Sequence, residues 1–291
     1  MTIQRINMEI VPALVCPARW DKLMVCTDGS AEGQNAVAVT LGLARACRSQ
    51  VYVVQVLVLV PEVQAVAANI KAFLVEEVQK NMKSIKVAAA KLEVPLQSVV
   101  PESQAPHAAI VSEAEKIRPD LVIMGRCGKT ALARLFMGNV TAQVIGHSPV
   151  NVLVVPRGAA VGFQRLLIAS DGSPYSKAAW KLALAMAKQA RSQLIGVVVA
   201  PGKGDVSEAK AIIQEMLTAA TRAEVPLKAI KAVVPQGVAP DIGIVQQAIK
   251  NEVDLIIMGS YGRGLKKLLM GSTTERVIGN APCPVLVVKV I

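Results

Sequence analysis

Two glycine-spaced segments, each following a run of aliphatic residues, have the residue types and the spacing to bind an anion. The glycines are Gly125, Gly128 and Gly138 in the first segment and Gly259, Gly262 and Gly271 in the second. In each segment the first pair ends an expected strand and the third glycine opens a helical pattern. Glycine lets the backbone approach an anion closely, and a helix start offers unpaired amides and a partial positive charge. The pattern predicts two phosphate cradles, or two relics of one.

Basic side chains accompany both glycine segments and suit the neutralisation of a polyphosphate, although an exposed polar loop would have the same composition. They are Arg126, Lys129 and Arg134 in the first segment and Arg263, Lys266 and Lys267 in the second.

The duplication extends over the whole chain. CTDGS at 26–30 recurs as ASDGS at 169–173, and SPVNVLVVP at 148–156 recurs as APCPVLVVK at 281–289. A period this long indicates duplicated domains and not a solenoid. We expect one domain over residues 1–157, including an N-terminal extension at 1–20, a linker at 158–162 and a second domain over 163–291.

Composition and element order predict the fold class. Hydrophobic residues make up 53% of the 291 residues and aromatic residues only 3%, so the strands are rich in small aliphatic side chains, as in parallel sheets covered on both faces. In the first half we expect strands at 22–27, 51–59, 98–100, 121–124 and 151–155, separated by helices at 31–48, 66–92, 107–117 and 139–145. The second half repeats this alternation. It predicts an α/β protein with helices on both faces of each sheet and a ligand crevice at the carboxyl ends of the strands.

Several classes of protein are disfavoured. The longest apolar stretch, at 51–60, is too short to span a membrane, and the N-terminus lacks a secretory signal, so a cytoplasmic location is expected. Five cysteines without metal-type spacing and only two histidines predict neither a disulfide framework nor a metal site. The net charge of +11 is spread over helical patterns without a nucleic-acid reader motif, so no specific nucleic-acid partner is expected.

From about Trp20 to Val290 the chain resembles a tandem universal stress protein. The resemblance rests on the DGS turn after the first strand, the aliphatic-Met-Gly strand end, the glycine loop and the final APCPVLVV strand. It implies two doubly wound, mostly parallel five-stranded sheets of the adenine nucleotide alpha hydrolase-like type. It also implies that the last strand of each copy can pair inside the chain to form a pseudo-dimer. A further homodimer is plausible.

The resemblance also implies an ATP-type nucleotide, or ADP or AMP, and allows Mg²⁺ to be held through the phosphates. In that family the strand-one aspartate and a backbone position at the end of strand two hold the adenosine end, while the glycine loop and the following hydroxyl hold the phosphates. The matching positions in the first copy are Asp28, Val56, Met124, Gly125, Gly128, Gly138, Asn139 and Val140. Those in the second copy are Asp171, Val199, Met258, Gly259, Gly262, Gly271, Ser272 and Thr273.

Each copy departs from the family pattern in a different way. The first has Asn139 where a hydroxyl is usual, and the second has one residue fewer between Gly262 and Gly271. The two aspartates could also serve only as turn residues.

No catalytic constellation accompanies the cradles, because the chain lacks both a Walker A motif and a Ser-His-acid set. The sequence therefore favours a nucleotide-binding stress or regulatory protein that switches conformation or partner. A slow ATP-hydrolysing enzyme and a nucleotide-free interaction module on the same fold remain as alternatives.

Overall fold

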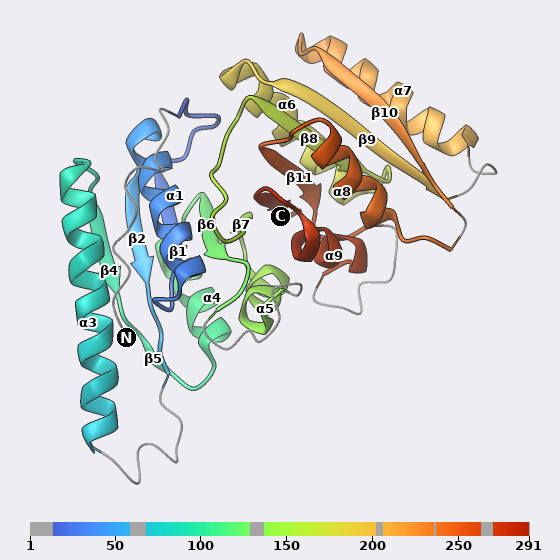
Figure 1. The fold of residues 1–291 in the computed structure, drawn as a ribbon. Coiled ribbons are helices and arrows are strands. Elements are labelled where there is room, and N and C mark those ends of the chain that lie inside the picture. The colour runs from blue at the N-terminus through green and yellow to red at the C-terminus, as the bar shows by residue number, and fades with distance from the viewer. Residues whose placement is uncertain are drawn as a thin grey trace.

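The structure is a computed structural model that describes residues 14–58, 68–128, 137–201, 206–235, 237–262 and 270–290. It contains two α/β copies, coloured blue to green and yellow to red in Figure 1. The first copy comprises β1 (Lys22–Cys26), α1 (Ala31–Cys47), β2 (Gln50–Val54), β3 (Leu57–Val58), α3 (Ala68–Lys91), β4 (Leu96–Val99), β5 (Glu102–Ser103), α4 (Pro106–Ile117), β6 (Leu121–Gly125), α5 (Asn139–His147) and β7 (Val152–Val155). The second comprises β8 (Arg165–Ser170), α6 (Pro174–Ala190), β9 (Gln193–Pro201), α7 (Val206–Ala223), β10 (Leu227–Val234), α8 (Pro240–Lys250), β11 (Leu255–Gly259), α9 (Ser272–Asn280) and β12 (Val285–Val288).

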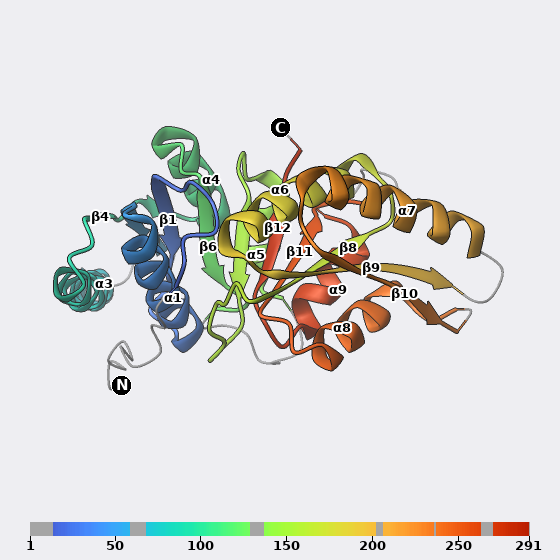
Figure 2. The same cartoon turned by 90° about the horizontal axis from the view of Figure 1, so that it is seen from above.

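The main strands of both copies join in one ten-stranded sheet in the order β10-β9-β8-β11-β12-β7-β6-β1-β2-β4. All neighbours within a copy are parallel. At the centre β7 and β12 pair antiparallel with Leu153 opposite Leu286, and Figure 2 shows the two copies side by side about this seam. The structure confirms the predicted fold of two doubly wound five-stranded sheets in a pseudo-dimer. The last strands, β7 and β12, are therefore paired with each other, and β4 and β10 form the outer edges of the sheet.

Strand side chains alternate between two hydrophobic cores, as expected for a sheet covered on both faces. Leu23 and Val25 belong to the core that includes buried residues of α1, α3, α6 and α7, whereas Met24 and Cys26 belong to the core that includes buried residues of α4, α5, α8 and α9. Both cores contain residues from both copies. Because the sheet is packed on both faces, the carboxyl ends of its parallel strands are held in place, together with the turns and loops that follow them.

The strand predicted at 51–59 is wrong as a single element. Pairing in the large sheet ends with β2 at Val54, and β3 pairs with β5 in a separate two-stranded sheet. Gln55 lies between them with its side chain buried, where its Oε1 accepts a hydrogen bond of 2.6 Å from Asn81 Nδ2. Asn81 Oδ1 in turn accepts from Gln34 Nε2. A buried amide needs such partners, and this amide cluster lies where the strand breaks. Leu59 falls outside the described residues.

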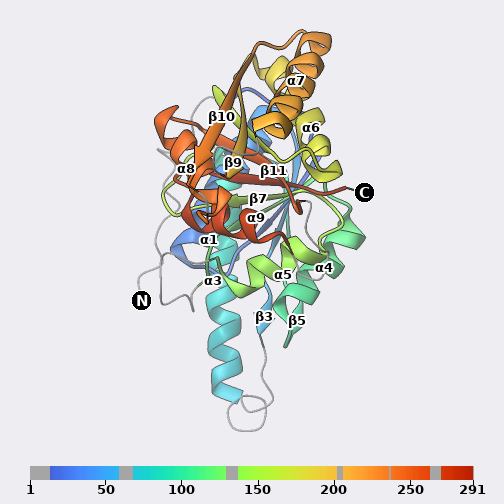
Figure 3. The same ribbon diagram turned by 90° about the vertical axis from the view of Figure 1, so that its right-hand side faces the viewer.

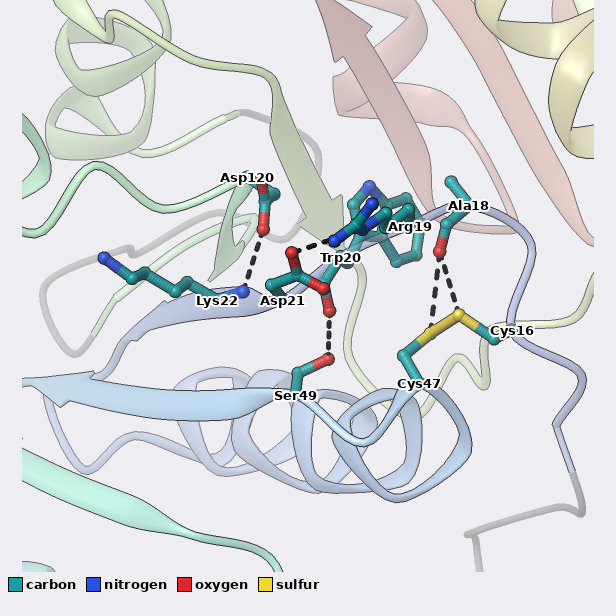
Figure 4. Close-up of polar contacts among 9 residues, drawn as sticks. All are labelled: Cys16, Ala18, Arg19, Trp20, Asp21, Lys22, Cys47, Ser49 and Asp120. Atoms are coloured by element: carbon teal, nitrogen blue, oxygen red, sulfur yellow. Dashed lines mark hydrogen bonds and ion pairs between the residues drawn. A yellow bond between two sulfur atoms is a disulfide. The ribbon is translucent and has the colours of Figure 1, made fainter.

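The expectation that the cysteines form no disulfide is also wrong, because Cys16 and Cys47 are bonded (Figure 4). The bond ties the segment before β1 to the last residue of α1. A hydrogen bond of 2.5 Å from Ser49 Oγ to the Trp20 carbonyl holds the same segment at the end of this helix. The two cysteines are 31 positions apart in sequence. Their proximity arises from packing across the helix end, which cysteine spacing alone does not reveal.

The same N-terminal segment also contacts the second copy. The carbonyl of Cys16 accepts a hydrogen bond of 3.0 Å from Gln189 Nε2 of α6, and the ring of Trp20 packs on Phe163 at a centroid distance of 6.5 Å. Both rings are buried. The disulfide-linked segment therefore bridges the two copies. No helix in the described part of the chain is long and apolar enough to cross a membrane.

Candidate functional site

The turn after the first strand of each copy has the same geometry. Gly29 and Gly172 both have φ of 78°, a conformation that favours glycine. The preceding aspartates close the turn: Asp28 Oδ1 accepts from the Ser30 amide at 2.9 Å, and Asp171 Oδ1 accepts from the Ser173 amide at 3.0 Å. One carboxylate oxygen in each copy is therefore used in the turn.

The serine of each DGS motif is the N-cap of the next helix. Ser30 Oγ accepts from the Gly33 amide at 3.1 Å to begin α1, and Ser173 Oγ accepts from the Ser176 amide at 3.2 Å to begin α6. An N-cap side chain satisfies an amide that has no partner within the helix. Because the amides of the same two serines donate to the aspartates, the helix starts also fix the orientation of the aspartate carboxylates.

The second oxygen of each aspartate faces the glycine loop. A Cβ added to Gly128 would lie 2.6 Å from Asp28 Oδ2, and one added to Gly262 would lie 2.5 Å from Asp171 Oδ2. Both distances are far shorter than a normal contact, so a side chain at either position would have to displace the aspartate carboxylate. The structure thus brings together the two motifs that the sequence analysis paired.

The third glycine closes each loop at its base. The Gly138 amide donates to Arg126 O and the Gly271 amide to Ser260 O, both at 2.9 Å. α5 and α9 begin at the next residue, and neither start has a side-chain cap. Each cradle therefore places a helix N-terminus with uncapped amides beside the strand-one carboxylate, an arrangement that suits an anionic group.

One buried threonine in each copy, not among the predicted site residues, links the start of the cradle helix to the preceding strand. Thr141 Oγ1 donates to Gly125 O at 3.1 Å, and Thr274 Oγ1 donates to Gly259 O at 3.0 Å. They occupy equivalent places, three residues after Gly138 and Gly271. Recurrence of Thr at the same position in both copies was the available signal.

The remaining sequence-predicted positions lie around the same strand ends. Met124 and Met258 are buried in β6 and β11, Val56 follows β2 and Val199 lies in β9. Asn139 and Ser272 are exposed first residues of α5 and α9, each followed by a half-buried residue, Val140 or Thr273.

The two cradles differ most at the helix residue that packs against the first glycine of the loop, Gly125 or Gly259. In the first copy Glu32 lies there, and its Oε2 accepts a hydrogen bond of 2.6 Å from the Cys127 amide, inside the glycine loop. Burial and the charge of Glu32 raise the pKa of the Cys127 thiol. In the second copy the equivalent residues are Tyr175 and Tyr261, whose rings are tilted against each other at 5.3 Å. The first cradle therefore carries an acidic group that the second lacks.

Arg126 has a contact that its sequence position did not suggest. Its guanidinium NH1 donates at 2.9 Å to Gly279 O, near the C-terminal end of α9 in the other copy. Helix C-termini favour such cations. The other basic residues proposed for phosphate neutralisation, Lys129, Arg134, Arg263, Lys266 and Lys267, lie outside the described residues.

A matching contact runs in the opposite direction across the seam. Lys289 Nζ donates at 2.7 Å to Ile145 O and at 3.1 Å to Gly146 O, near the end of α5. Burial lowers the pKa of this amine. Each cradle helix thus ends on a basic side chain of the other copy, although the two side chains come from different positions of the repeat.

The universal stress protein family model matches residues 19–156 and 162–289, so the chain belongs to this family and carries two tandem universal stress protein domains. A universal stress protein of Methanocaldococcus jannaschii is 32% identical over 142 residues, covering 47% of this chain and 83% of that protein. A universal stress protein of Thermus aquaticus is 32% identical over 137 residues, covering 44% of this chain and 99% of its own length. The crystal structure of a universal stress protein from Archaeoglobus fulgidus has the same fold, with a TM-score of 0.71 at 19% identity over 92% of this chain and 98% of that one.

Proposed function

We propose that this universal stress protein binds an ATP-type nucleotide at the carboxyl ends of its parallel strands and responds to nucleotide by a change in conformation or in partner binding. The observation that carries the proposal is the convergence of three groups in the second copy. The Asp171 carboxylate faces Gly262, Gly271 closes the loop onto Ser260, and α9 begins there without a side-chain cap. The carboxyl ends of the parallel strands are where doubly wound folds bind ligands.

The second cradle is the stronger site in this proposal. A phosphate oxygen that accepted from the Cys127 amide in the first cradle would have to displace the Glu32 carboxylate, and two anions at this distance repel. The second cradle has Tyr175 at that position and hydroxyls at Ser272 and Thr273. Its loop amides therefore face no carboxylate at the position of Tyr175, and the acidic residue in the first turn of α9, Glu275, is exposed to solvent.

Each group in the second cradle then has a defined task. Asp171 and the backbone of Val199 orient the adenosine end, as the family resemblance implies, while the α9 amides and the Ser272 hydroxyl hold the phosphates. A magnesium ion would be held through the phosphates, since Mg²⁺ is commonly bound through substrate phosphates with few protein ligands. No side chain of the described residues is assigned to catalysis.

A route from nucleotide to conformation is available through α9. Its first turn lies at the second cradle, and near its last turn Gly279 O accepts from Arg126, the residue that follows Gly125 of the first cradle. A ligand that shifts α9 would act on this contact, because a packed helix moves as a unit. We propose that this seam transmits occupancy of one copy to the other.

The test is a calorimetric titration of ATP into the wild-type protein and two matched variants, Gly262→Ala and Gly128→Ala. Each added methyl group would displace the strand-one carboxylate of one cradle only. We expect Gly262→Ala to abolish the tighter binding event and Gly128→Ala to retain it. Binding that survives in Gly262→Ala with unchanged affinity, or no heat from wild type at millimolar ATP, would overturn the proposal.

A further inference from the structure

A groove of about 680 Å³ runs between α3 and the outer edge of the first copy's sheet. Its floor is formed by the buried side chains of Leu57, Val78 and Met82, and exposed Val87 and Val100 form its walls. Figures 1 and 3 show α3 standing beside β4, β3 and β5 at this end of the molecule. The size lies within the range of small-molecule sites, roughly 300–1,000 Å³.

The groove follows from the position of α3 at the sheet edge. One stripe of the helix, containing Val78 and Met82, packs into the core. The adjacent stripe, at Gln79, Lys83, Lys86 and Val87, lines the groove beside β4, the last strand of the sheet. Val87 is 50% exposed and Val100 is 42% exposed, so apolar surface faces this space from both the helix and the chain after β4.

The charges along the groove are unbalanced. Glu102, an acidic residue of the lining, is paired with Lys71 at 3.3 Å, and Lys80 on the same helix is paired with Glu76 at 2.7 Å. Lys83 and Lys86 line the groove and form no ion pair with any residue that the structure describes. An apolar floor beneath two available ammonium groups is complementary to an amphipathic anion.

The second copy lacks this combination at the equivalent place. Aligned on the shared EVPL motif, Gln214 and Leu217 of α7 occupy the positions of Lys83 and Lys86. The space beneath α7 is a cavity of about 10 Å³ lined by residues such as Trp180 and Met216. Gly196 of β9 allows this filling, since a Cβ there would lie 2.6 Å from Met216 Cε. The groove is therefore a property of the first copy and not a general consequence of the fold.

We propose that the groove binds a single-chain amphiphile with an anionic head, such as a fatty-acid carboxylate. The alkyl chain lies on Leu57, Val78 and Met82, and the carboxylate pairs with Lys83 and Lys86. Burial of the chain supplies the affinity through its apolar area, and the lysines select the charge of the head group. None of the residues that line the groove is a cradle position, so the proposal does not rest on nucleotide binding.

The test is a calorimetric titration with octanoate, decanoate and dodecanoate below their micelle concentrations, with dodecanol as the uncharged analogue. We expect one site per chain and a gain in affinity of about fourfold for each added methylene. The variant Lys83→Gln/Lys86→Gln should weaken dodecanoate binding by about fivefold, the effect of two exposed ion pairs, and leave dodecanol unaffected. Lys80→Gln/Lys91→Gln removes the same charge from α3 outside the groove and should bind dodecanoate as wild type does.

A filling variant tests the location independently of charge. Val87→Trp should abolish dodecanoate binding, whereas Thr218→Trp, the equivalent change on α7, should leave it intact. Equal binding of dodecanol and dodecanoate, or full binding by Val87→Trp, would overturn the proposal. Binding only to phosphatidylglycerol vesicles and not to monomeric dodecanoate would assign the surface to a membrane instead. A concentration-dependent dimer in size-exclusion chromatography that Val87→Trp disrupts would assign it to a second copy of the chain.

Discussion

Removing the Cys16–Cys47 disulfide should destabilise the first copy by an amount that follows from its loop. The bond closes 31 positions of chain, and chain-entropy arithmetic gives about 3.7 kcal/mol for a loop of this length. With a urea m-value of about 3 kcal/mol/M, that loss lowers the unfolding midpoint by about 1 M. The native contacts of Cys16 with Gln189 and of Trp20 with Phe163 should persist in the reduced protein, because neither requires the bond.

The assay is urea unfolding with and without dithiothreitol, followed by tryptophan fluorescence. The variant Cys16→Ser/Cys47→Ser is the control, and its midpoint should match that of the reduced wild type and should not respond to reductant. Thiol titration in denaturant should count three free cysteines before reduction, Cys26, Cys127 and Cys283, and all five afterwards. Identical midpoints for oxidised and reduced wild type, with the bond shown to be present beforehand, would refute this account of the N-terminal segment. Since thiols stay reduced in most cytosols, the same measurement bears on the predicted cytoplasmic location.

Three other changes probe the cradles and the seam. Glu32→Gln, made in the Gly262→Ala background, should strengthen ATP binding at the first cradle on the order of fivefold. The reason is that removing one opposing charge is worth up to ~1 kcal/mol. A calorimetric titration that shows no gain in affinity would contradict the role given to Glu32. Gly259→Ala should lower the free energy of unfolding by about 1–3 kcal/mol, because the added Cβ would lie 2.7 Å from the Tyr175 carbonyl carbon. Urea unfolding of wild type and variant measures this difference. Lys289→Met should cost about 1–3 kcal/mol by the same assay, because the α5 carbonyls lose a donor. Burial lowers the pKa of Lys289 from 10.5, so the folded chain releases this proton before the unfolded chain does. Stability should therefore rise with pH between the lowered value and 10.5, and the absence of any difference in this rise between wild type and Lys289→Met would contradict the assignment.

The fold was predictable because local patterns and the repeat agree. Alternating aliphatic strands and helical stripes indicate a parallel sheet, and glycines at strand ends recur where a side chain would meet the strand-one aspartate, as at Gly128 and Gly262. The resemblance to the universal stress protein family implied that the apolar final strands pair between the copies. These features depend on residue type and period, which a sequence displays directly.

The features that escaped prediction depend on contacts between distant segments. The hydrogen bond from Arg126 to Gly279 and those from Lys289 to the end of α5 exist only because β7 and β12 pair. The contact between Glu32 and the Cys127 amide joins a helix start to a loop 95 residues later. The strand break at Gln55 follows from a buried partner on α3. No local spacing rule signals such contacts.

The proposed function requires that one of the two cradles holds a nucleotide tightly. Mass analysis of gently purified protein after denaturation measures nucleotide identity and stoichiometry together. We predict close to one adenine nucleotide per chain for wild type and for Gly128→Ala, and close to none for Gly262→Ala. A stoichiometry near zero for wild type, together with no ATP binding on titration, would contradict it.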